Sequence, residues 1–75
     1  MSRLPQVTAR KMIRALQGAG FLIVRTSGSH HFLQHPTDRS RWATVSVHSG
    51  DLRRDDVRDI LKQTKLSREE FLKLL

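Results

Sequence analysis

The chain contains no cysteine, so it can form neither a disulfide nor a thiolate metal site. This absence favours a reducing, cytoplasmic setting. Long apolar runs are also missing, since the longest, residues 21–24, is far too short for a membrane span or a signal peptide. We therefore expect a soluble protein with no membrane partner. Because 75 residues can bury only one modest core, we expect a single domain over residues 1–75.

Acidic residues are few in this chain. It has 7 Asp and Glu residues against 14 Lys and Arg residues, which gives a formal net charge of +7. So dense a basic excess is typical of proteins that bind a polyanion, and nucleic acid is the leading candidate. A membrane surface is a weaker alternative, because the basic residues are spread along the chain rather than gathered in one helix. Ordinary solubilising surface charge is the remaining interpretation.

The first half of the chain predicts one helix and two strands. After an extended lead-in over residues 1–7, Thr8 can cap a helix that Gly18 and Gly20 end. The buried stripe of this helix is expected to comprise Ala9, Met12, Ile13 and Leu16. Strands are predicted over residues 21–26 and 30–35, joined by a Gly-Ser turn.

The second half predicts a third strand and two helices. Residues 42–48 alternate, so that Ala43, Val45 and Val47 face the core while Trp42, Thr44, Ser46 and His48 form a polar opposite face. Asp51 can cap a helix with the apolar stripe Val57, Ile60 and Leu61. Ser67 and Glu70 form a capping box, flanked by the staple pair Leu66 and Phe71. The expected fold is α+β, an antiparallel three-stranded sheet with helices on one face.

Three of the four histidines lie within residues 30–35, directly after the Gly28-Ser29 turn. Histidine can give and take protons near neutral pH, since its unperturbed pKa is about 6.5. His30 and His31 must point to opposite faces of a strand, and the pattern leaves open which one faces outward. His35, before Pro36, is expected to cap or pack. Metal binding by the histidines is disfavoured, because no cysteine or carboxylate stands at ligand-like spacing among the clustered three, and we expect no metal or other cofactor.

Short motifs follow one another along nearly the whole chain. They are Leu4-Pro5-x-Val7, Gly18-Ala19-Gly20-Phe21, Gly28-Ser29-His30, His35-Pro36, Val45-x-Val47-His48-Ser49-Gly50 and Leu66-Ser67-x-Glu69-Glu70-Phe71. In this order and spacing they resemble the HicA toxin family, although residues 53–56 depart from the Lys-Pro-Gly-Thr-like helix entry of many relatives. The resemblance implies a double-stranded-RNA-binding-domain-like fold and an mRNA endonuclease neutralised by a HicB-like antitoxin. It also implies that His30 is the catalytic histidine, with His31 as the reserve candidate.

RNA cleavage without a metal needs a base for the 2′-hydroxyl proton, an acid for the leaving 5′-oxygen and positive charge near the phosphate. His30 can supply the first or the second. RNA contacts are expected from Ser29, Arg25, Arg53, Arg54, Trp42 and His48. Two of these have a structural alternative: Arg54 can belong to a self-compensating charged surface with Arg58, Asp55 and Asp59, and Trp42 can simply cover the sheet edge. A non-catalytic RNA-binding domain of the same fold is the alternative function.

Overall fold

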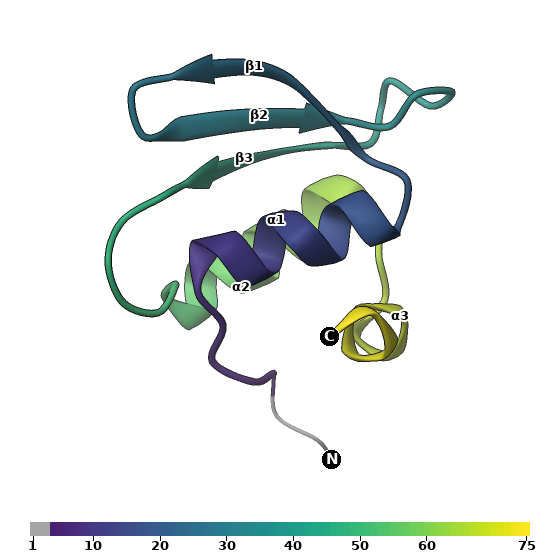
Figure 1. The fold of residues 1–75 in the computed structure, drawn as a ribbon. Helices are drawn as coiled ribbons and strands as arrows, with labels where there is room; N and C mark the ends of the chain where they lie inside the picture. The colour runs from purple at the N-terminus through teal and green to yellow at the C-terminus, as the bar shows by residue number, and fades with distance from the viewer. Residues whose placement is uncertain (1–3) are drawn as a thin grey trace.

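A computed structural model describes residues 4–75, so the first three residues of the predicted lead-in lie outside it. The order of elements is helix, three strands and two helices, as the sequence predicts (Figure 1). The elements are α1 (Ala9–Gly18), β1 (Leu22–Ser27), β2 (His30–Gln34), β3 (Trp42–Ser46), α2 (Arg54–Thr64) and α3 (Arg68–Leu74).

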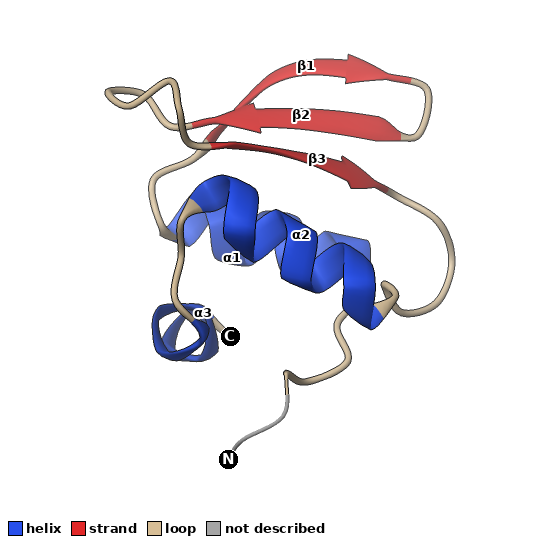
Figure 2. Ribbon diagram, turned by 180° about the vertical axis from the view of Figure 1, so that it is seen from behind, coloured by secondary structure: helices blue, strands red, loops and turns tan. Residues whose placement is uncertain are grey.

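The three strands form one antiparallel sheet in the order β1-β2-β3. Both views show α1 and α2 on one side of this sheet, while its opposite face is open (Figures 1 and 2). The short helix α3 lies beyond them and packs against α1. The expected α+β class and the double-stranded-RNA-binding-domain-like arrangement are therefore confirmed.

The described residues share one hydrophobic core between the sheet and the helices. The predicted stripes of α1 and α2 are buried in it, as are Ala43 and Val45 of β3. Leu66 and Phe71 are buried in the same core, beside the capping box in which the Ser67 hydroxyl accepts from the Glu70 N–H. The Thr8 cap of α1 is also present, with its hydroxyl accepting from the Lys11 N–H at 3.2 Å.

The predicted cap of the second helix is wrong. The helix α2 begins at Arg54, and its N-cap residue Arg53 makes no side-chain capping bond. Asp51 instead forms a β-bridge with Thr8, and the adjacent Leu52 N–H donates to the Val7 carbonyl at 2.8 Å. Because this pairing holds residues 51 and 52 in extended backbone against the lead-in, the helix cannot start until two residues later.

The strand β1 is exposed along its whole length. Leu22, Ile23 and Val24 are 56%, 40% and 59% exposed, although they belong to the longest apolar run of the chain. In Figure 1 β1 is the strand farthest from the helices, so Ile23 stays partly exposed even though it pairs with Leu33 on the helix-covered face. The pairing register also shifts between Ile23 and Arg25, which interrupts the alternation of side chains at Val24.

Candidate active site

The Gly-Ser turn fixes the start of β2. Gly28 has a φ of 57°, a left-handed conformation that glycine adopts without a steric penalty. The carbonyl oxygen of Ser29 accepts a hydrogen bond from the Val47 N–H at 2.7 Å, and the Nδ1 atom of His31 lies 3.4 Å from the same oxygen. The turn is thus tied to the residue that follows β3, and the orientation of the next histidines is set by a rigid hairpin.

The two neighbouring histidines lie on opposite faces of the sheet. His30 is exposed on the open face, where it pairs with Ser27 of β1 and Ser46 of β3. His31 is half-buried and shares the helix-covered face with the fully buried Leu33. Strand alternation alone does not show which of the two histidines faces outward. His30 does, because α1 lies under the other face only.

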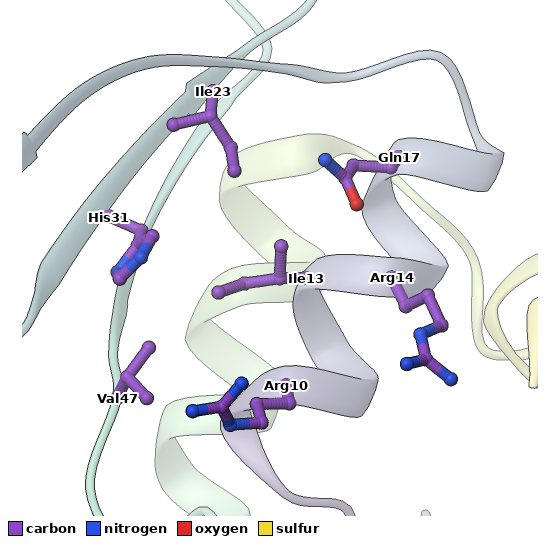
Figure 3. A pocket seen from close by; sticks show the side chains of 7 residues that line it. All are labelled: Arg10, Ile13, Arg14, Gln17, Ile23, His31 and Val47. Atoms are coloured by element: carbon purple, nitrogen blue, oxygen red, sulfur yellow. The ribbon is translucent and has the colours of Figure 1, made fainter.

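A pocket of about 280 Å³ lies where His31 faces the helix α1. The helix contributes Arg10, Ile13, Arg14 and Gln17 to its lining, and Ile23 and Val47 complete the wall on the strand side (Figure 3). None of these lining residues is acidic. The arrangement places an imidazole on the same side as the Arg10 guanidinium, a combination that can supply proton transfer and positive charge to a phosphate.

Sequence reasoning missed the contribution of α1 to this pocket. Arg10, Arg14 and Gln17 lie outside the buried stripe that the sequence predicts for this helix, and the sequence pattern assigns them no function. A usable signal existed, because their i, i+4, i+7 spacing places all three on one face beside the apolar stripe. The sequence could therefore predict that this basic face forms one wall of a site. It does not show which strand residue lies opposite.

The predicted RNA contacts do not gather in one place. The Arg25 guanidinium carbon lies 4.4 Å from the centre of the Phe32 ring, and the Trp42 side chain is 44% exposed on the open face. His48 and Arg53 line a separate hollow of about 160 Å³ between β3 and α2. Of the predicted contacts, only Ser29 is next to the His31 pocket, because its carbonyl accepts a hydrogen bond from the lining residue Val47.

The charged surface of α2 is partly self-compensating. Arg58 and Asp55 form an exposed ion pair at 4.0 Å, one turn apart on the helix. Such exposed pairs contribute little stability, roughly 0–1 kcal/mol. The predicted charge compensation on this surface is therefore seen at Arg58. Arg54 is exposed at the first position of the helix.

The third clustered histidine has a structural role. The Nδ1 atom of His35 accepts from the backbone N–H groups of Thr37 and Asp38 at 3.3 and 3.1 Å. Its ring packs edge-on against buried Phe21, with 5.4 Å between centroids. The predicted capping or packing role is thus confirmed. Across residues 4–75, no three His, Asp or Glu side chains stand close enough together to hold a metal ion.

Two carboxyl groups have a lowered pKa, and neither lines the His31 pocket. A hydrogen bond from the Ser40 hydroxyl, at 2.6 Å, lowers the pKa of Asp38 in the loop after β2. The backbone N–H of Ser67 does the same for the pKa of Glu70 in the capping box of α3. Both groups stabilise local backbone turns.

The fold and the sheet order place this chain among the small α+β proteins with a double-stranded-RNA-binding-domain-like fold. The family model described as the HicA toxin of bacterial toxin-antitoxin systems matches residues 9–66. Because this match covers more than half of the 75 residues, the chain belongs to the HicA toxin family. A comparison with curated protein sequences gives no significant match. Over residues 4–75, none of the helices has the length and apolar character needed to span a membrane.

Proposed function

We propose that this HicA-family protein is a metal-independent endoribonuclease that cleaves mRNA in the cytoplasm. The observation that supports this most directly is the half-buried imidazole of His31 in a pocket that is also lined by Arg10. General acid–base catalysis needs a positioned proton-transfer group, and charge near the phosphate stabilises the transition state. The pocket supplies both from rigid elements.

The proposed reaction uses the 2′-hydroxyl of the RNA as the nucleophile. A base removes the 2′-hydroxyl proton, the 2′-oxygen bonds to phosphorus, and the bond from phosphorus to the 5′-oxygen breaks. The leaving 5′-oxygen takes up a proton, so the products are a 2′,3′-cyclic phosphate and a 5′-hydroxyl. The histidine serves one of the two proton transfers, and Arg10 stabilises the negative charge that builds on the phosphate oxygens.

Both β2 histidines are candidates for this role. His30 is the position that matches the Gly-Ser-His turn of the family, but its side chain is exposed on the open face of the sheet. His31 faces α1 across an open pocket and has the positive charge of Arg10 nearby. We therefore place His31 first on geometry and keep His30 as the second candidate.

Cleavage in EDTA, followed by analysis of the product ends, tests the function. We expect 2′,3′-cyclic phosphate or 3′-phosphate products, and no cleavage of an RNA with 2′-deoxyribose at the scissile position. Activity that requires a divalent ion, or cleavage of the 2′-deoxy substrate, would indicate a metal-activated water instead. Binding without any cleavage would favour the alternative, a non-catalytic RNA-binding domain of the same fold.

The family assignment implies an antitoxin partner, and we propose a HicB-like protein in this role. A net charge of +7 favours a partner with an acidic surface. Expression of the chain alone should stop growth, and co-expression of the HicB-like protein should restore it. Growth arrest that persists with the antitoxin present would contradict this pairing.

A further inference from the structure

We infer that the His31 pocket is a subsite for one ribonucleotide, in which Arg10 holds the phosphate and Gln17 contacts the base. This inference deepens the proposed function and rests on RNA being the substrate. Arg10 and Gln17 lie within the residues that match the family model but outside the short motifs named in the sequence analysis.

The pocket lies at the small end of the size range of ligand sites. Its volume of about 280 Å³ is just below the roughly 300–1,000 Å³ of ordinary small-molecule sites. Its lining comes from α1, from β1 and β2, and from the residue after β3, so it is formed by the packed fold rather than by one loop.

The chemistry changes along the pocket in the same order as along a nucleotide. Figure 3 shows Arg10 at the end where Val47 lies, Gln17 extended toward Ile23 at the other end, and His31 across from Ile13 in between. A ribonucleotide likewise presents an anionic phosphate, a sugar with its 2′-hydroxyl, and a flat base with polar edges. With the phosphate at Arg10, the sugar lies at the level of the imidazole.

Arg10 is suited to bind the phosphate because nothing acidic competes for it in the pocket. The helix α1 contains no Asp or Glu, and no lining residue is acidic. A guanidinium binds phosphate oxygens through two parallel N–H donors. In contrast, the Arg14 side chain is turned away from the strands in Figure 3 and also lines a second pocket beside α3.

Gln17 is suited to read a base. Its amide offers both donors and an acceptor, which is what hydrogen bonding to the edge of a base requires. Ile23 is 40% exposed on this side of β1 and gives the flat face of the base an apolar surface. A base held in this way would be chosen by its hydrogen-bonding edge, so Gln17 would set the nucleotide preference of the cleavage site.

Binding experiments test the phosphate end with matched variants of one helix. The probe is a 2′-fluoro oligonucleotide, which cannot be cleaved through its 2′-oxygen. Arg10→Ala and Lys11→Ala remove one positive charge each, but Lys11 does not line this pocket. We expect Arg10→Ala to flatten the log–log salt dependence of binding by roughly 0.7, the value for one phosphate contact on single strands. Lys11→Ala should leave the slope unchanged, and equal effects of both variants would overturn the assignment.

Cleavage of RNAs that differ in one nucleotide at the scissile step tests the base end. The wild-type protein should prefer one nucleotide, and Gln17→Ala should reduce that preference by roughly 5- to 150-fold, the discrimination that good base-edge contacts provide. Gln63→Ala, a matched change on α2 in a different pocket, should leave the preference intact. A wild-type protein without preference, or a Gln17→Ala variant with the wild-type preference, would overturn the assignment.

The subsite and the ribonuclease activity can be disproved independently. If the wild-type protein binds RNA through Arg10 but does not cleave it, the subsite stands at its phosphate end and the proposed ribonuclease is wrong. If it cleaves RNA while Arg10→Ala and Gln17→Ala behave like their controls, the ribonuclease stands and the subsite is wrong. All four positions lie on the helix surface away from the buried stripes, so circular dichroism should show native folding in each variant.

Discussion

The two neighbouring histidines have different surroundings on the two faces of the sheet. On the helix-covered face, His31 stands opposite α1 and becomes one wall of a basic pocket. On the open face, His30 is exposed beside a surface that includes Phe32, Arg25 and Trp42. The residues of the open face are as rich in functional groups as those of the pocket, but no second element encloses them.

In this fold, the candidate site therefore differs from the exposed surface in having a second element, α1, opposite the histidine. A catalytic group must be held within hydrogen-bond reach of its substrate, and two rigid walls achieve this better than one. The helix α1 provides the second wall on one face only.

The largest difference is expected between His31→Ala and His30→Ala. Loss of a positioned acid or base typically costs about 10²- to 10⁴-fold in rate, so His31→Ala should lose cleavage by that factor while His30→Ala stays close to wild type. The measurement is the rate on a defined RNA, with circular dichroism as the folding control. The reverse result would assign the role to His30, as the family's Gly-Ser-His turn implies, and would move the catalytic site to the open face.

The same contrast should appear in stability when one leucine is changed on each face. Leu33 is 1% exposed and packs toward the helices, whereas Leu22 is 56% exposed and pairs with Gln34 on the open face. Leu33→Ala should lower the free energy of unfolding by about 2–5 kcal/mol, and Leu22→Ala by less than about 0.5 kcal/mol. Urea denaturation measures both. Equal losses would mean that another chain or segment covers the open face in solution.

Most of the fold could be predicted because its rules are local. The Thr8 cap, the Ser67–Glu70 capping box and the helical stripes each depend on residues within one or two turns. The start of α2 could not be predicted in this way. Asp51 is a good capping residue, but its pairing with Thr8 joins segments more than 40 residues apart, and no local pattern reports that contact.

The candidate site was only half predictable for the same reason. The Gly28-Ser29 turn placed two histidines on alternate faces of β2, and strand alternation could go no further, since Phe32 and Leu33 are both apolar. The choice depends on where α1 packs. The exposure of Leu22 and Val24 was equally hidden, because an apolar run looks the same whether a helix covers it or not.

The basic residues of the two regions should differ in their effect on RNA binding. Arg53 and Arg54 stand at the start of α2, whereas Arg25 is stacked on Phe32 and Arg39 lies in the loop after β2. The double change Arg53→Ala with Arg54→Ala should flatten the log–log salt slope by about 1.4, at roughly 0.7 for each phosphate contact. Arg25→Ala with Arg39→Ala removes the same charge and should leave the slope unchanged. If the second pair flattens the slope and the first does not, RNA crosses the open face.

The smallest expected effect concerns the contact between Arg25 and Phe32 on the open face of the sheet. Its guanidinium lies over the Phe32 ring at 4.4 Å, and an exposed cation–π pair of this kind contributes about 0.5–1 kcal/mol. A double-mutant cycle with Arg25→Met and Phe32→Leu should show a coupling energy of that size in urea denaturation. The matched cycle with Arg54→Met and Phe32→Leu should show none beyond about 0.3–0.5 kcal/mol, the limit of additivity for independent sites. A coupling of zero for Arg25 would mean that its side chain leaves the ring in solution and is available to RNA, as the sequence alone predicts.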